Sequence, residues 1–484
     1  MIATAATGRM DADVLVIGSG AGGATTATVL AEAGLDVLVV EEGAWVEQGD
    51  VVPFSLDQME RQYRSGGVTV ALGFPSLAYT EGRCAGGGTE VNSGLYWRPP
   101  GELLERWRDD FRIRDFEPED LLSIADEVEQ AISVSMVPGG YGAPSEILRD
   151  GAAALGWQHG EVPRWMTYPK GKDAVTGERQ SMTRTYLPRA AAAGARIVTG
   201  CRIDRLVLDG SRATGAVTTL SDGTPGTISF RHVFVCGGAI QTPAILQRSG
   251  VRGHVGRTLA VHPTVKLAAR FADVINVPDD VPVHQVKEFA PHLSFGGSAS
   301  NPGLVALSLL DQWPTFRKHV VDWPRMSVYY AAITSEGRGR VMSLPRIKDP
   351  IVTYGLTHRD RELLRSGLAR LALLMLEAGA EEVFPSFKGA PAIRSRRDVA
   401  TMQQAFSASK ATVMTVHLCS TVPMGEATDR CGADSHGLVH GLRNVHVNDA
   451  SLLPTAPGVN PQASVMAFAI RNARHFVATG GSRA

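Results

Sequence analysis

The sequence of 484 residues lacks a long apolar run and an excess of either charge. No stretch approaches the roughly 20 apolar residues of a membrane-spanning helix, and the first residues lack the basic and apolar segments of a secretory signal. Acidic (49) and basic (48) side chains nearly cancel, so no overall field draws the chain to nucleic acid or anionic lipid. We therefore expect a cytoplasmic protein that binds neither nucleic acid nor a membrane.

Cysteine is scarce, and its spacing is uninformative. The five cysteines are Cys84, Cys201, Cys236, Cys419 and Cys431, with no CxxC pair among them. An odd, scattered set argues against a disulfide framework and against a zinc site, and fits reduced thiols. His436, His440 and His446 lie close together in sequence but lack a metal-ligand pattern, so we expect them to be structural or solvated and predict no metal.

The chain also lacks internal repeats and any low-complexity linker. Its length exceeds the roughly 250 to 300 residues at which a single hydrophobic core stops growing, so two domains are expected. Because no composition shift marks a boundary, we expect domains that are woven from several chain segments.

What the sequence does contain begins with a βαβ pattern. The apolar run 13–17 leads into GSGAGG, in which Gly18, Gly20 and Gly23 form GxGxxG, and a helix of small residues follows. A second apolar strand covers 36–40 and ends at Glu41. Such glycines let the backbone approach a pyrophosphate at the helix N-terminus, and the acidic residue can accept the ribose hydroxyls. This is a dinucleotide-binding fingerprint that by itself does not separate FAD from NAD.

A glycine triplet follows at 86–88. The segment 82–92, GRCAGGGTEVN, resembles the first signature of the glucose-methanol-choline (GMC) oxidoreductases, with Thr89 and Asn92 as its hydroxyl and amide residues. Three consecutive glycines, Gly86, Gly87 and Gly88, leave bare amide groups that can lie against a flavin or its diphosphate.

A second stretch strengthens this resemblance. Residues 238–250, GAIQTPAILQRSG, follow the apolar strand HVFVC and are similar to the second GMC signature. The run VGRTLAVHP, further along the chain, also resembles the family sequence and ends at His262 and Pro263. We expect His262 to be structural, because a histidine beside a proline in a turn commonly caps backbone carbonyls.

The resemblance extends over most of the chain and implies a fold. It implies an α/β protein with a Rossmann-like FAD-binding domain and a discontinuous substrate domain built on an antiparallel sheet. Ile203, in a hairpin, is expected to contact the adenine side of FAD through its backbone. The stretch 265–330 is the least family-like and is expected to carry part of the substrate specificity. The implied segments are FAD-binding 10–105, 181–263 and 416–484, with cap or substrate segments 106–180 and 264–415.

The C-terminal part carries the expected catalytic pair. His417 lies in the segment VHLCSTVPMG, and Asn460 lies in APGVNPQAS. These segments resemble those of the family branch that pairs a histidine with an asparagine. A neutral imidazole can accept a hydroxyl proton, and an asparagine amide can donate to the substrate oxygen. The resemblance also implies FAD contacts from Asp449 and Ala450, and places Pro461 where a helix N-terminus faces the flavin.

These residues predict oxidation of an alcohol by hydride transfer to FAD, with oxygen or another carrier as the electron acceptor. Since 82–98 contains no histidine, the FAD is expected to be non-covalent. Cys84 is expected to be a buried filler. A non-redox lyase and a silent flavin-binding protein stay open as alternatives.

The substrate is the most open part of the prediction. The segment GGGTEVNSGLYWR resembles the sequences of bacterial enzymes that oxidise a primary hydroxyl of an aminoglycoside sugar. Sterols, choline-like alcohols and long-chain alcohols stay open as alternative substrates. A polycationic sugar requires carboxylates at the pocket mouth. By position in the sequence the candidates are Glu90, Asp279, Asp280 and Glu288.

Overall fold

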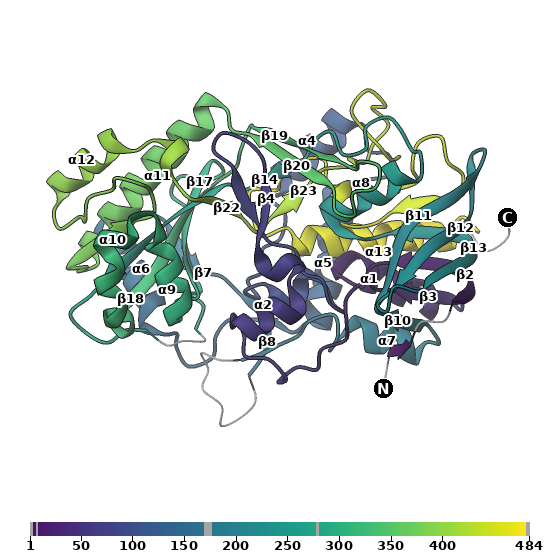
Figure 1. The fold of residues 1–484 in the computed structure, drawn as a ribbon, viewed down its shortest axis with the longest axis horizontal. Helices are drawn as coiled ribbons and strands as arrows, with labels where there is room; N and C mark the ends of the chain where they lie inside the picture. The colour runs from purple at the N-terminus through teal and green to yellow at the C-terminus, as the bar shows by residue number, and fades with distance from the viewer. Residues whose placement is uncertain (1–2, 6–7, 169–176, 277–279, 481–484) are drawn as a thin grey trace.

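The computed structural model describes residues 3–5, 8–168, 177–276 and 280–480. Two large sheets lie side by side within it, each with its own helices (Figure 1). The N- and C-terminal strands and helices gather on one sheet, and the green middle of the chain surrounds the other. The segments alternate between the two, so the domains are interwoven.

The first sheet has the strand order β1-β10-β3-β2-β13-β12-β11, with β24 beside β13. Its strands are β1 (Ala3–Ala5), β2 (Arg9–Ile17), β3 (Val37–Val40), β10 (Arg196–Thr199), β11 (Cys201–Asp209), β12 (Arg212–Leu220), β13 (Pro225–Val235) and β24 (Val445–Val447). All pairs from β1 to β13 and the pair with β24 are parallel, whereas the β11–β12–β13 hairpins are antiparallel. The last residues of β2 and all of β3 are buried, as strands covered on both faces require.

Two helices cover one face of this sheet. Helix α1 (Ala21–Glu32) packs against α13 (Gln462–Ala478), the first helix after the glycine loop against the last helix of the chain. Small residues permit this approach: a Cβ added at Gly22 would lie 2.1 Å from the carbonyl oxygen of Asn448. Asn448 in turn donates to Thr26 of α1 at 2.8 Å and accepts from Asn472 of α13 at 3.0 Å. The glycine loop is thus held by the C-terminal segment.

The second sheet has the order β4-β5-β22-β15-β18-β17-β16-β7, with β21 beside β15. Its strands are β4 (Thr69–Ala71), β5 (Leu77–Tyr79), β22 (Val413–Thr415), β15 (Thr264–Arg270), β18 (Met326–Ile333), β17 (Leu293–Ser298), β16 (His284–Val286), β7 (His159–Glu161) and β21 (Glu382–Pro385). Nearly all its pairs are antiparallel; β22 and β5 are parallel.

One face of the second sheet packs on α11 (His358–Glu377), which begins at a capping box formed by Thr357 and Asp360. The residues of α11 that sequence spacing assigns to the core, Leu364, Leu368, Leu371 and Met375, are each 0% exposed. Because side chains alternate along a strand, other residues face away from α11; part of that face forms a smaller core, in which Ala268 and Val328 pack with Val305.

The remaining helices and strands connect or cover these layers. They include α2 (Leu56–Gln62), α3 (Gly88–Val91), α4 (Gly101–Phe111), α5 (Pro118–Ala131), β6 (Val134–Ser135), α6 (Ala143–Ala154), β8 (Arg164–Thr167), β9 (Glu178–Arg179), α7 (Tyr186–Ala192), α8 (Gly238–Arg248), β14 (Ala260–Val261), α9 (Pro302–Ser308), α10 (Trp313–Phe316), β19 (Arg338–Met342), β20 (Ile351–Gly355), α12 (Arg396–Ala405) and β23 (Leu418–Cys419). Among the described residues no helix combines the length and the apolar character needed to cross a bilayer.

The fold class expected from the sequence is confirmed: a Rossmann-like sheet stands beside a discontinuous, mainly antiparallel one. Strands β4 and β5 lie within the expected segment 10–105 yet pair into the second sheet, through β22. The exact domain boundaries stay a prediction.

The substitution Gly22→Ala tests the close approach of α1 to the C-terminal segment. Its Cβ would overlap Asn448, so we expect a loss of about 1–3 kcal/mol in unfolding free energy. Denaturant unfolding measures this loss. Gly101→Ala, at the exposed start of α4 where a Cβ meets nothing within 4 Å, is the matched control. Equal stability of the two variants would contradict the packing argument.

Candidate active site

Two glycine loops from distant parts of the sequence meet at the N-terminus of α1. Gly18 has φ +97°, and Gly20 caps the helix without a side-chain hydrogen bond. Gly87 has φ +53°, and a Cβ there would lie 3.1 Å from the Cα of Gly20. The amide of Gly86 donates to the hydroxyl of Ser19 at 3.1 Å. A helix N-terminus with free amide groups and no side chains around it is suited to a diphosphate.

Glu41, predicted to bind a ribose, is buried at the end of β3. One carboxylate oxygen accepts from the amide and hydroxyl of Ser19 at 3.0 and 2.7 Å, and the other accepts from the amide of Gly43 at 2.8 Å. Burial raises the pKa of this carboxyl. Glu41 therefore braces the first glycine loop in this structure.

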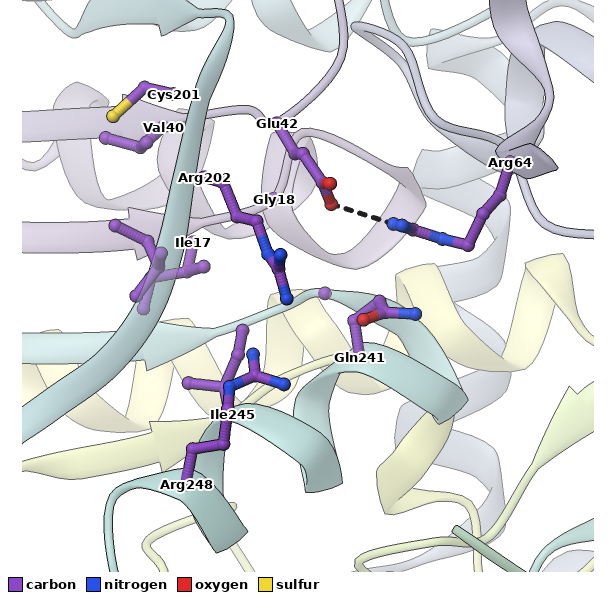
Figure 2. Close-up of a pocket in the computed structure, with 12 residues that line it drawn as sticks. Ile17, Gly18, Val40, Glu42, Arg64, Cys201, Arg202, Gln241, Ile245 and Arg248 are labelled. Carbon is purple, nitrogen blue, oxygen red and sulfur yellow. Dashed lines mark hydrogen bonds and ion pairs between the residues drawn. The ribbon is translucent and has the colours of Figure 1, made fainter. Parts of the chain in front are cut away.

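The neighbouring Glu42 lines a cavity beside the loop (Figure 2). It forms an ion pair with Arg64 at 2.8 Å. The cavity is bounded by the predicted residues Gly18 and Ile203 and also by Ile17, Val40, Arg64, Cys201, Arg202, Gly237, Gln241, Ile245 and Arg248. Figure 2 shows Arg202 of β11 pointing toward Gln241 of α8. Residues of the fingerprint, of the hairpin and of the second signature thus border one cavity.

The other predicted cofactor contacts hold the loops in place. Thr89 donates to the carbonyl of Gly86 at 2.7 Å, and Asn92 donates to Gln462, the first residue of α13, at 2.9 Å. Gly88 begins α3, and Pro461 is the N-cap of α13, where no side chain caps the helix. A second free helix N-terminus therefore faces the first signature.

Asp449 is also occupied by the protein. It accepts from the amide of Gly238 at 2.7 Å and from the hydroxyl of Thr242 at 2.5 Å, and so fastens α8 to the end of β24. Ala450 follows in a short 3-10 turn. A contact of these two residues with FAD stays a prediction.

Together these residues fit FAD. The two abutting glycine loops and the uncapped N-termini of α1 and α13 present backbone amides that suit the diphosphate, and a cavity lined by Ile203 lies beside the first loop.

The predicted catalytic pair is brought together. His417 lies between β22 and β23, and its amide donates to the hydroxyl of Thr415 at 3.2 Å. Asn460 lies 43 residues further along, immediately before α13, with its Nδ2 3.4 Å from His417 Nε2. Both side chains are partly buried.

A second histidine completes this cluster. His262 Nδ1 lies 2.8 Å from His417 Nδ1, and the two rings meet edge to face with centroids 5.1 Å apart. The amide of Gly458 donates to His262 Nε2 at 2.9 Å. The ring of His262 thus contacts His417 and accepts from an amide, where the sequence suggested that it caps backbone carbonyls. Its expected structural role stays a prediction.

These contacts fix the tautomers of both rings. His262 accepts at Nε2, so when neutral it carries its proton on Nδ1 and donates to His417 Nδ1. His417 then accepts at Nδ1 and carries its own proton on Nε2. In this tautomer His417 Nε2 and Asn460 Nδ2, 3.4 Å apart, both carry hydrogen, so neither accepts from the other. An oxygen beside the pair, about 3 Å from each nitrogen, could accept from both.

Burial keeps both rings neutral. Burial first, and the positive charge of Lys287 second, lower the pKa of His417 to about 4. Burial, His417 and Lys287, in that order, lower the pKa of His262 well below its ordinary value. The charge of Lys287 thus lowers the pKa of both histidines. No sequence motif indicated this lysine.

Other predicted residues lie apart from this cluster. His446 is stacked on Phe234, His436 on His475, and His440 contacts the carbonyl of Gly425. The described residues contain no group of three or more His, Cys, Asp or Glu side chains arranged to hold a metal. Cys84 is fully buried, as expected.

The carboxylates proposed for the pocket mouth do not face the histidines. Glu90 is buried and accepts from the Thr183 hydroxyl at 2.7 Å, Asp280 is buried, and Glu288 is exposed and accepts from the Gln158 amide at 2.9 Å. Asp279 lies outside the described residues.

The fold and the site define an oxidoreductase of the FAD-binding class. A family model for the FAD binding domain matches residues 13–48, and models for GMC oxidoreductase match residues 59–264 and 334–469. An uncharacterised GMC-type oxidoreductase, y4nJ of Sinorhizobium fredii, is 39% identical over 96% of this chain and 94% of its own. The chain belongs to the GMC oxidoreductase family, and its cofactor is FAD.

More distant proteins agree with this assignment. Paromamine 6'-oxidase of Streptomyces fradiae is 26% identical over 96% of this chain and 90% of its own. The crystal structure of pyridoxine 4-oxidase from Mesorbium loti superposes with a TM-score of 0.72 at 19% identity, covering 96% of this chain and 99% of that one. The second comparison shows a shared fold.

Nuclear magnetic resonance of the ring nitrogens tests the tautomers. With ¹⁵N-labelled histidine and a His417→Asn difference spectrum, we expect His417 to stay neutral with its proton on Nε2 until the pH falls toward about 4. The sign follows from burial, which disfavours the charged ring. Protonation near pH 6.5, or a proton on Nδ1 at neutral pH, would contradict the arrangement.

Proposed function

We propose that this protein oxidises an alcohol to a carbonyl compound, with His417 and Asn460 as its catalytic pair. The observation that carries the proposal is the proximity of His417 Nε2 and Asn460 Nδ2, 3.4 Å apart beside the uncapped start of α13. When bound, FAD supplies the hydride acceptor.

The pair acts first on the hydroxyl oxygen. Both donors can bind that oxygen, and their hydrogen bonds strengthen as negative charge develops on it. Asn460 cannot take a proton, so its part is limited to donation. Holding the oxygen at two points also orients the carbon that loses the hydride.

The hydroxyl proton needs an acceptor, and His417 is our candidate. Its Nε2 lone pair becomes free only when its proton sits on Nδ1 and is donated to His262. His262 then carries its own proton on Nε2, which displaces the amide of Gly458. We therefore assign proton acceptance by His417 to a state in which the His262–Gly458 hydrogen bond has opened.

The names of relatives support an alcohol substrate. The names of paromamine 6'-oxidase and pyridoxine 4-oxidase describe oxidation at a stated position of the substrate. A long-chain-alcohol oxidase of Arabidopsis thaliana is 25% identical over 95% of this chain, and its name states its substrate class. A sugar-like or aminoglycoside primary hydroxyl is the finer candidate from sequence. It lacks support from charge, since Glu90 and Asp280 are turned to other partners or buried.

His417→Ala is the direct test of the pair. We expect alcohol-dependent bleaching of the flavin absorbance, measured without oxygen, to slow by about 10²- to 10⁴-fold, as loss of a general acid or base does. FAD should stay bound. His358→Ala, at the exposed start of α11, is the control and should react as the parent does. Unchanged bleaching by His417→Ala would remove His417 from the proposal.

The same assay separates other functions. A lyase on this fold would turn over substrate with no bleaching, and a silent flavin-binding protein would do neither.

The attachment of FAD has its own test. No histidine occurs in 82–98, and the Cys84 thiol is fully buried with its pKa raised by burial, so it is not poised to attack. Acid precipitation of the protein should therefore leave yellow colour in the supernatant. A yellow pellet would mean a covalent bond.

A further inference from the structure

A row of polar side chains crosses the face of the second sheet that is turned away from α11. Lys266 of β15 pairs with Tyr330 of β18, and Tyr330 pairs with Gly296 of β17. Gly296 pairs with Gln285 of β16. Because Gly296 has no side chain, Tyr330 can lie across it: a Cβ there would meet the hydroxyl at 2.4 Å. That hydroxyl accepts from Gln285 Nε2 at 3.2 Å.

Lys287 joins this row. It follows Gln285 by two residues and so emerges on the same face. Its Nζ lies 5.0 Å from the centre of the Trp97 ring, within the range of a cation–π contact. Trp97 is itself fixed, because its Nε1 donates to Gln285 Oε1 at 3.0 Å. The ammonium group therefore lies over an aromatic ring that the Gln285 amide holds in place.

This face looks onto the catalytic cluster. Thr264, two residues before Lys266, donates to the carbonyl of His262 at 3.1 Å. A Cβ on Gly458, whose amide contacts His262, would lie 3.2 Å from the Thr334 hydroxyl just after β18. The charge of Lys287 lowers the pKa of both histidines.

Among the described residues, neither lysine has a counter-charge: no hydrogen bond or ion pair reaches the amino group of Lys266 or Lys287, and burial lowers the pKa of each to about 8. The buried Arg64, by contrast, is paired with Glu42, Glu81 and Asp349. A partly buried ammonium group without an ionic partner costs stability, and a ligand of opposite charge would offset that cost.

We propose that the substrate is an alcohol that carries an oxyanion group, a carboxylate or a phosphate, and that Lys287 binds this group. The hydroxyl of the same molecule then meets His417 and Asn460, as the proposed function requires. The proposal replaces the polycationic substrate that the sequence suggested.

Binding of unreactive probes tests the lysine site apart from catalysis. The probes are 4-methylbenzoate, 4-methylphenyl phosphate and 4-methylbenzamide, titrated into the FAD-loaded enzyme and followed by the visible flavin spectrum. We expect at least one anion to bind ~10- to 100-fold more tightly than the amide, the range of a charge-assisted hydrogen bond. The stronger of the two anions identifies carboxylate or phosphate as the source. An amide that binds as tightly as both anions overturns the proposal.

Variants tie the preference to the residue. Lys287→Met should abolish the preference for the anion, and Lys287→Arg should restore most of it. Lys266→Met, three strands away on the same face, should change it less than Lys287→Met does. Lys388→Met removes an exposed lysine elsewhere and should leave the preference intact. A Lys287→Met variant that keeps the preference, or that loses FAD while binding all three probes alike, overturns the proposal.

The hydroxymethyl versions of the same probes separate the two hypotheses. If the anionic analogue binds selectively but no alcohol bleaches the flavin, the proposed function fails and the lysine site stands. If all three alcohols bleach the flavin with equal kcat/KM, the function stands and the lysine site fails.

Discussion

The arrangement of the candidate site depends on the hydrogen bond between His262 and His417. This bond joins residues 155 positions apart and, together with the amide of Gly458, determines which nitrogen of each ring carries a proton. Three segments must meet for this to happen: the turn before β15, the link between β22 and β23, and the loop before α13. The donor pattern that a substrate encounters is therefore a property of the assembled fold.

The second sheet serves two purposes through the alternation of its strands. One set of side chains packs on α11 and forms a core, and the other set carries Lys266, Tyr330, Gln285 and Lys287. Because both sets share the same strands, packing behind the sheet also fixes the polar groups in front of it. Strands thus carry Lys266, Tyr330 and Gln285, and Lys287 follows directly after β16.

The cofactor side depends on close backbone approach. Two glycine loops lie against each other, and Asn448 and Asp449 fasten the C-terminal segment to both α1 and α8. Several polar residues of the signatures are used for this internal support, as Glu41 and Thr89 show. A motif residue can therefore be required for binding because it shapes the loop.

The sequence by itself determined the Rossmann-like unit, the two glycine signatures, the helical core spacing of α11 and the pairing of His417 with Asn460. Each depends on local periodicity, on glycine geometry or on a motif read over a few residues. Only the tertiary structure decided the contacts of His262, the internal use of Glu41 beside the cavity-lining Glu42, and the position of Lys287 near the histidines. These depend on contacts between distant segments, and a histidine in a turn or a lysine at a strand end has the same local pattern whatever it meets after folding.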